Sequence, residues 1–158
     1  RAWRTQKSLY PHRLLSVWRR KQVGEAMKYL VDSNILVAVY KRDDSTHERA
    51  TRLVKKFHSY GNTFIVNNLV IQESTTVISH KMGMRDANMF YQGLMDFVDE
   101  IIPVEVSVEE KAWRIFFKQT KKGTSFVDCA NLAVIEHYKL DGILSFDEFY
   151  PKTLRRDH

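Results

Sequence analysis

Short apolar runs alternate along this chain with longer segments in which apolar residues recur every three or four positions. The short runs predict buried strands at 28–33, 63–66, 101–106 and 142–146. The longer segments predict helices at 45–60, 69–82, 86–99, 107–119 and 126–139. Strands that alternate with helices in this way favour an α/β fold with a central parallel sheet and helices on both faces.

Two helix starts carry a local signal of their own. Ser45 with Glu48, and Ser107 with Glu110, have the spacing of capping boxes. In a capping box the hydroxyl accepts a hydrogen bond from a backbone amide of the first turn, and the acid reaches back to the amide of the capping residue. The two pairs therefore predict helices that begin beside Ser45 and Ser107.

Length and composition are those of one globular domain. The 158 residues are enough for a single core, and no apolar run approaches the roughly 20 residues of a membrane-spanning helix. Cys129 is the only cysteine, so no intrachain disulfide can form. We expect a cytoplasmic protein that does not interact with membranes.

The net charge of +6 is concentrated at one end of the chain. Residues 1–26 hold seven basic side chains against one acid, whereas basic and acidic residues balance in 27–158. Met27 directly precedes the first strand, and we divide the chain there into a basic leader, 1–26, and a domain, 27–158. Three interpretations of the leader remain open: sequence from cloning or upstream translation, a native extra helix, or a tethered binding segment.

Four acids stand where apolar runs meet the next element. Asp32 follows the first strand, Glu73 lies early in the helix after the second, Asp128 opens the helix at 126–139, and Asp147 follows the last strand. A parallel sheet gathers the carboxyl ends of its strands at one edge, where ligands bind. Carboxylates collected there repel one another unless they share a cation, and oxygen ligands suit Mg²⁺ or Mn²⁺. The pattern predicts a metal-dependent active site, with Asn34 holding Asp32 through an amide hydrogen bond.

Each acid also has a simpler interpretation. Asp32 is a good N-cap for an apolar helix at 35–37, and Ser125 with Asp128 is close to a capping box. Glu73 is favoured near a helix N-terminus by the helix dipole alone, and Asp147 fits a turn. The four together are more specific than any one of them.

The motifs around these acids resemble a PIN domain and, more narrowly, the VapC-type toxins of toxin–antitoxin pairs. The resemblance covers about residues 27–150 and rests on Val31-Asp32-Ser33-Asn34, on Glu73, on Ser125-Phe126-Val127-Asp128-Cys129-Ala130 and on Leu144-Ser145-Phe146-Asp147. It implies a three-layer α/β/α fold, a Mg²⁺- or Mn²⁺-dependent endoribonuclease, an antitoxin partner and a homodimer. Asp32, Glu73, Asp128 and Asp147 fall on the family's acidic positions, and Ser125 and Ser145 on its hydroxyl positions.

Two residues depart from the family pattern, and the basic segment 1–26 has no counterpart in the toxin domain. Cys129 stands where a small residue is frequent, and Glu148 directly follows Asp147, which leaves two acids as candidates for the last position. The hydrolysis of a phosphodiester needs an activated water and neutralised phosphoryl charge, which a metal held by carboxylates provides. We therefore predict an endoribonuclease that acts as a toxin. The alternatives are a non-catalytic scaffold that binds RNA or protein, and a nuclease of RNA processing.

Weaker signals concern binding. Lys81, Arg85, Lys121 and Lys122 are candidates for RNA phosphate contacts, with a merely solvated charged surface as the alternative. The aromatic residues at 113, 116 and 117 are expected in the core rather than in a base-stacking platform. The leader is expected to pack on the domain and to direct an arginine at the carboxylates, as antitoxin tails do. A dimer surface is expected on the helices at 69–82 and 86–99, from Met82, Met84, Met89, Phe90 and Leu94.

Overall fold

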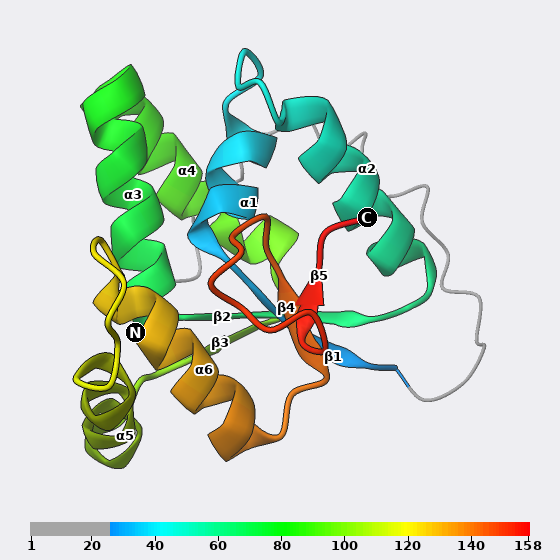
Figure 1. The fold of residues 1–158 in the computed structure, drawn as a ribbon. Coiled ribbons are helices and arrows are strands. Elements are labelled where there is room, and N and C mark those ends of the chain that lie inside the picture. Colours follow the sequence, from blue (N-terminus) through cyan, green and yellow to red (C-terminus); the bar gives the residue numbers. More distant parts are fainter. Residues whose placement is uncertain (1–25) are drawn as a thin grey trace, which may run out of the picture.

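The fold is built on a five-stranded, fully parallel sheet (Figure 1). The computed structural model describes residues 26–158. The strand order is β3-β2-β1-β4-β5, so β1 lies at the centre with β2 on one side and β4 on the other. The strands are β1 (Lys28–Val31), β2 (Thr63–Asn67), β3 (Glu100–Ile102), β4 (Gly142–Leu144) and β5 (Arg155–Arg156).

Helices cover both faces of this sheet and complete three layers. Alternate residues of β1 show the division: Tyr29 and Val31 join the core cluster on one face, and Leu30 joins the cluster on the other. Figure 1 shows α1 to α4 above the sheet and α5 and α6 below it. The predicted α/β/α architecture is therefore confirmed. The helices are α1 (Ser33–Tyr40), α2 (His47–Ser59), α3 (Asn68–Met82), α4 (Met84–Phe97), α5 (Val106–Phe116) and α6 (Phe126–Tyr138).

The chain order reverses direction at β1. From β1 the chain moves outward through β2 to β3, and it then crosses back under the sheet through α5 and α6 to β4. The carboxyl ends of β1 and β4 therefore flank a topological switch point, which is where open α/β sheets bind their ligands. Asp32 directly follows β1 and Ser145 directly follows β4.

The observed elements differ from the predicted ones at the sheet edges and the helix starts. β3 ends at Ile102, because Pro103 has no N–H to donate, and β5 has no counterpart among the predicted strands. Both capping boxes were wrong. Asp44 accepts the backbone and hydroxyl hydrogen bonds of Thr46, so α2 begins after Thr46 rather than after Ser45. The amide of Val104 is held by Asn68, and α5 begins at Val106, one residue before Ser107.

Two residues expected on a dimer surface belong to the core instead. Phe90 and Leu94 are buried on the face that α4 turns toward the sheet and α3. The exposed apolar residues of α4 are Met84, Tyr91 and Met95, which share a separate stripe about a quarter turn from the buried one. No helix within residues 26–158 is long and apolar enough to cross a membrane.

Candidate active site

Asp32 is a buried carboxylate at the centre of the switch point. Its side chain is 2% exposed, and its backbone N–H donates to the carbonyl of Leu144 at 3.0 Å, which fixes it between β1 and β4. One carboxylate oxygen accepts from the backbone N–H of Ser33 at 2.8 Å. The other accepts from Asn34 Nδ2 and from Ser145 Oγ, both at 2.6 Å. Asp32 is thus the N-cap of α1 and also the centre of a polar cluster.

The donors around Asp32 are themselves held in place. The side-chain carbonyl of Asn34 accepts from the backbone N–H of Phe146 at 3.2 Å, which turns the amide nitrogen toward Asp32. Ser145 Oγ accepts from the backbone N–H of Asp147 at 3.0 Å while its hydroxyl proton points at Asp32. The loop after β4 therefore orients the Asp32 carboxylate, and the expected hydrogen bond from Asn34 is present.

A second set of polar side chains runs through the core to Asp128. The Tyr150 hydroxyl donates to Asp128 at 2.8 Å and accepts from Asn131 Nδ2 at 2.9 Å. The same Asn131 nitrogen lies 3.5 Å from Asp32, and its carbonyl accepts from Asn67 Nδ2 at 2.7 Å. This buried chain, Asn67–Asn131–Tyr150, links the end of β2, the helix α6 and the loop after β4 to both acids.

None of the three members of the buried chain was predicted to be a site residue. Asn67 ends a strand immediately before a helix, which is a cap signal, and its carbonyl indeed accepts from the amide of Val70. Asn131 is a polar residue in an otherwise apolar stretch of α6. Each signal was visible, but nothing in the sequence shows that the two amides meet each other and Tyr150.

Burial and like charges raise the pKa values of both central acids. Desolvation is the main cause of a pKa of about 7 for Asp32, and the negative charges of Asp128 and Glu73 add to it against the hydrogen bond from Ser145. Desolvation also raises the pKa of Asp128, with further contributions from Asp147 and Glu73, although the Tyr150 bond lowers it. The four acids thus act on one another as unneutralised charges.

Tyr150 is kept protonated by the same surroundings. Burial and the neighbouring carboxylates of Asp32 and Asp128 raise the pKa of its hydroxyl well above the ordinary value. The hydroxyl therefore remains a donor to Asp128 over the whole physiological pH range. Burial likewise raises the pKa of the Cys129 thiol, which argues against a nucleophilic thiolate there.

The other two acids lie at the rim. Glu73 is half-buried in the second turn of α3, and Asp147 is exposed in the loop after β4. One Asp147 oxygen accepts from the backbone N–H of Phe149 at 2.8 Å, so the interpretation of this residue as a turn former also holds. Ser125 is the N-cap of α6 and accepts from the amide of Val127 at 3.1 Å.

The donor set suits a hard divalent cation. All four candidate ligands are carboxylates, and Asp32 and Asp128 carry pKa values raised partly by their acidic neighbours, an effect that a shared cation reverses. Within residues 26–158 no three His, Cys, Asp or Glu side chains are already arranged to hold a metal ion together.

The basic candidates divide into two groups. Lys121 and Lys122 lie in the loop that leads into Ser125 and α6. Lys81 stands two helical turns beyond Glu73, about 12 Å along the axis of α3, and Arg85 follows it in α4. The structure therefore brings Lys121 and Lys122 close to the start of α6 and leaves Lys81 and Arg85 at the far end of α3.

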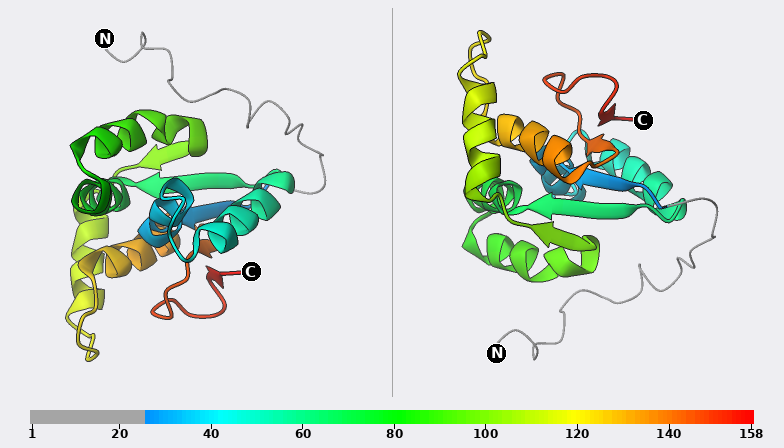
Figure 2. Two further views of the ribbon diagram at one scale, coloured as in Figure 1. Left: turned by 90° about the horizontal axis from the view of Figure 1, so that it is seen from above. Right: turned by 90° about the horizontal axis from the view of Figure 1, so that it is seen from below.

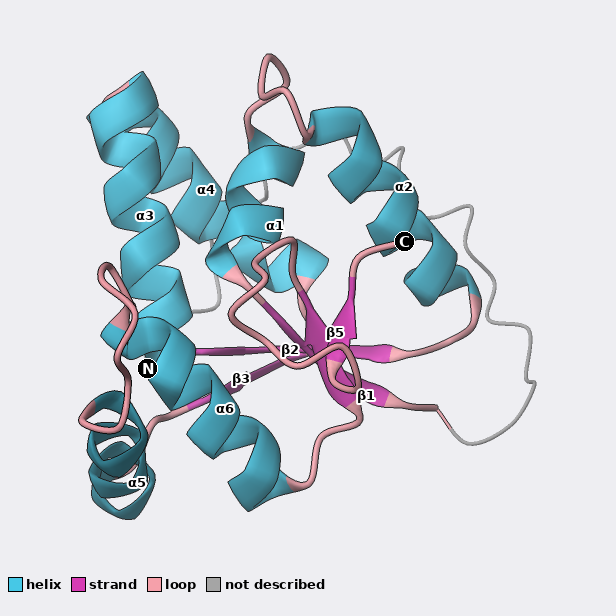
Figure 3. Cartoon of the chain, in the orientation of Figure 1, coloured by secondary structure: helices cyan, strands magenta, loops and turns pink. Residues whose placement is uncertain are grey.

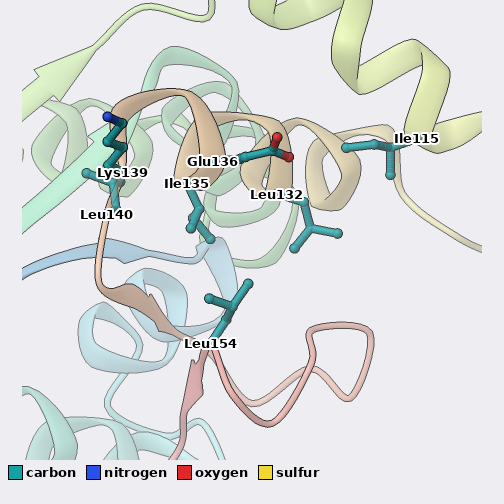
Figure 4. Close-up of a pocket in the computed structure, with 7 residues that line it drawn as sticks. All are labelled: Ile115, Leu132, Ile135, Glu136, Lys139, Leu140 and Leu154. Atoms are coloured by element: carbon teal, nitrogen blue, oxygen red, sulfur yellow. The ribbon is translucent and has the colours of Figure 1, made fainter.

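A separate apolar groove lies farther along α6. It has a volume of about 480 Å³, and Figure 4 shows Leu132 and Ile135 of α6 facing Leu154 across it. It starts one turn beyond Asp128 and continues to Leu140, past the end of the helix. Its charged residues are Glu136 and Lys139, and it has no group of converging polar side chains such as the one around Asp32.

Comparison with known proteins identifies the family of the chain. The PIN domain family model matches residues 29–153. The 23S rRNA-specific endonuclease VapC20 of Mycobacterium tuberculosis is 26% identical over 117 residues, which are 74% of this chain and 87% of that protein.

Two solved structures share the fold. The crystal structure of VapC20 from Mycobacterium tuberculosis, described as a sarcin–ricin loop cleaving toxin, superposes with a TM-score of 0.66 at 23% identity, over 75% of this chain and 89% of that one. The structure of VapBC2 from Rickettsia felis, bound to a DNA fragment from its promoter, gives a TM-score of 0.59 at 14% identity. The match covers 82% of this chain and 98% of that chain.

Replacing Tyr150 by Phe should destabilise the protein and raise the pKa of Asp128 further. The change removes the hydroxyl that donates to Asp128 and leaves the amide of Asn131 without that acceptor, a loss of about 1–3 kcal/mol in the free energy of unfolding. Urea unfolding and carboxyl NMR titration measure the two effects. Tyr29→Phe is the matched control, because that buried ring donates its hydroxyl only to the sulfur of Met27. An unchanged Asp128 titration in Tyr150→Phe would contradict the assignment.

Asp32 should make the metal-free protein less stable as the pH rises. The folded pKa of about 7 exceeds the unfolded value of 3.8, so the folded state retains a proton that the unfolded state releases. The stability contribution is therefore full below pH 3.8 and is lost as the pH rises through 7. In EDTA, the free energy of unfolding of Asp32→Asn relative to the unsubstituted protein should increase by up to about 4 kcal/mol between pH 4 and pH 8.

This pH effect has an internal control. The Lys41 side chain lowers the pKa of the exposed Asp43 carboxylate below its ordinary value of 3.8, so Asp43 is ionised in both the folded and the unfolded state above about pH 4. The stability of Asp43→Asn relative to the unsubstituted protein should therefore not change between pH 4 and pH 8. If the free energy of unfolding depends on pH equally in Asp32→Asn and in the unsubstituted protein, then ionisation of the Asp32 carboxylate does not destabilise the folded state.

Proposed function

Because this chain belongs to the PIN domain family, we propose that it is a metal-dependent endoribonuclease and the toxin of a toxin–antitoxin pair. One observation carries the proposal: a buried Asp32 held by three donors beside Asp128, with Glu73 acting on both. The 26% identical relative is named as an endonuclease specific for 23S rRNA, which supports RNA as the substrate class. We place the activity in the cytoplasm, as the composition suggests.

Asp32, Glu73, Asp128 and Asp147 are the residues that we propose hold Mg²⁺ or Mn²⁺. When bound, such an ion activates water and neutralises charge on the phosphoryl group. Asn34 and Ser145 keep the Asp32 carboxylate oriented, and Tyr150 does the same for Asp128. We propose that Lys121 and Lys122, in the loop that leads into α6, contact phosphates of the RNA.

A scaffold that only binds RNA or protein is less well supported. Burying Asp32 at 2% exposure beside other acids is costly, and a docking function gives no reason for that cost. A nuclease of RNA processing uses the same site, and the relationship to the VapC toxin favours the toxin role.

Replacing Asp128 by Asn should abolish RNA cleavage and leave the fold intact. The amide oxygen can still accept from Tyr150, whereas the charge that we propose holds the metal is gone. Cleavage of labelled RNA with Mg²⁺ measures the loss, and circular dichroism checks the fold. Asp141→Asn is the control, because that exposed carboxylate accepts from the Lys28 amide at the start of β1. Cleavage by Asp128→Asn at the unsubstituted rate would refute the proposed site.

We propose an antitoxin as a protein partner, because the Rickettsia felis structure is of a VapBC assembly with the same fold. The basic leader resembles antitoxin tails in composition, and we retain the proposal that it directs an arginine at the carboxylates. Residues 1–25 lie outside the described residues, so that proposal stays a prediction.

We further propose that two copies associate through the exposed stripe of α4, Met84, Tyr91 and Met95. Tyr91 and Met95 lie one helical turn apart, and Met84 lies two turns before Tyr91 on the same stripe. Symmetric dimers commonly bury exposed apolar side chains of this kind. The double change Tyr91→Lys, Met95→Lys should yield a monomeric mass in sedimentation equilibrium at micromolar concentrations. Tyr60→Lys, at an exposed position just after α2, should not change the mass. A monomeric mass for the unsubstituted protein would exclude the dimer.

A further inference from the structure

An aromatic cluster at the end of α5 is exposed rather than buried. Phe117 is 77% exposed and Trp113 is 40% exposed, so the expectation that these two residues belong to the core was wrong. Phe116, expected there with them, is half-buried. Isolated apolar residues are common on protein surfaces, but here three aromatic rings lie together on one helix end. The cluster therefore requires an explanation other than packing.

The rings are stacked and fixed. Trp113 and Phe117 lie 5.6 Å apart between centroids with planes inclined by 24°, and Trp113 rests on Phe126 at 4.1 Å. Phe126 packs against the core, and the Trp113 indole N–H donates to Glu109 at 3.3 Å. The exposed pair is thus a preformed flat surface that loses little conformational entropy when a planar group stacks on it.

Basic residues follow this surface along the chain. Between residues 113 and 122 the chain carries four cations and no acid. Arg114 lies 4.0 Å from Glu110, whereas no ion pair in the described part of the chain involves the three lysines. These four exposed cations are Arg114, Lys118, Lys121 and Lys122.

The cluster adjoins the candidate active site. Phe126, which supports Trp113, stands two residues before Asp128 in the first turn of α6. Figure 2 shows the α5–α6 loop, which carries Lys121 and Lys122, projecting from the same side of the molecule as the loop that follows β4 and carries Asp147. In Figure 3 these two loops are the pink segments on either side of α6.

We propose that Trp113 and Phe117 form a platform on which a base of single-stranded RNA stacks, with Lys121 and Lys122 contacting its phosphates. Exposed aromatic faces flanked by cations are how proteins bind single strands without reading sequence. A protein partner is less suited to this surface, because lysine is depleted in protein–protein interfaces and three of the four cations are lysines. The inference deepens the proposed ribonuclease function and depends on it for the choice of RNA.

The test measures binding of a fluorescein-labelled single-stranded RNA of mixed sequence by anisotropy, in the full chain carrying Asp128→Asn so that the RNA stays intact. Phe117→Ala and Phe117→Leu should each weaken binding by roughly 5- to 150-fold, the range for the loss of one stacked base. Phe117→Tyr should bind like Phe117, because it keeps the aromatic face. Tyr60→Ala, at a 59% exposed aromatic position remote from α6, should have no effect.

The leucine variant separates stacking from simple apolar contact. Leucine keeps apolar bulk and lacks an aromatic face, so full binding by Phe117→Leu together with weak binding by Phe117→Ala would overturn the platform in favour of an apolar docking surface. Equal binding by all the variants would also overturn it. Because Phe117 is exposed, these changes should not affect folding.

A second measurement locates the stacked base. Removing the base from one nucleotide at a time should weaken binding at one or two positions, and the same removals should have no further effect in Phe117→Ala. Fully additive losses would contradict the platform. Lys121→Gln and Lys122→Gln should each make the negative slope of log affinity against log salt less steep by about 0.7. Lys81→Gln, at the far end of α3, should leave that slope unchanged.

The parent chain with Asp128 intact separates this inference from the proposed function. If it cleaves RNA with Mg²⁺ while the Phe117 variants bind like the parent, the platform fails and the nuclease stands. If it cleaves no RNA while binding still depends on the Phe117 ring, the nuclease fails and the platform stands.

Discussion

A carboxylate buried behind the central strand of a parallel sheet is stable only if its surroundings supply hydrogen bonds and positive charge. The structure provides the first requirement for Asp32 through Ser33, Asn34 and Ser145. It supplies negative rather than positive charge, because the neighbouring residues Asp128 and Glu73 are acids. Burial and these two charges together raise the pKa of Asp32 to about 7. The side chains of Asn34 and Ser145 are held in turn by backbone amides of the loop after β4, and the chain Asn67–Asn131–Tyr150 holds Asp128. The protein folds around an electrostatic strain that a cation would relieve.

The central part of the fold was predictable because its signals are local. Strands β1, β2 and β4 are continuous apolar runs, and buried parallel strands read in this way. β5 has the sequence Arg155–Arg156, and only its pairing with β4 makes it a strand. The misplaced starts of α2 and α5 have the same origin, because Asp44 and Asn68 hold the backbone just ahead of each helix through contacts that a spacing rule does not include. At both helix starts, a hydrogen bond from the backbone to a nearby Asp or Asn side chain decided where the helix begins, in place of the predicted capping box.

The acidic residues of the candidate site could be proposed from the sequence, whereas its buried neutral polar residues could not. An acid directly after an apolar strand, such as Asp32, is conspicuous because burying it is costly. Asn67, Asn131 and Tyr150 are inconspicuous, since each also fits an ordinary role as a cap, a helix residue or a core aromatic residue. Their function lies in a mutual geometry that brings together residues 64 and 19 positions apart. Such pairings belong to the tertiary structure and leave no pattern of spacing.

If an acidic site acts on a polyanion, residues outside the acidic cluster have to bind the substrate. The four acids repel phosphate, and the described domain has no excess of positive charge to overcome that repulsion at long range. The cations are instead placed locally, with Lys118, Lys121 and Lys122 on the segment that leads into α6. An exposed aromatic stack among them adds binding energy that does not depend on charge and does not weaken with salt. In the function that we propose, helix α6 would carry the negative charge for the chemistry at Asp128, and through Phe126 it would support the aromatic surface that offsets the repulsion between this charge and the substrate.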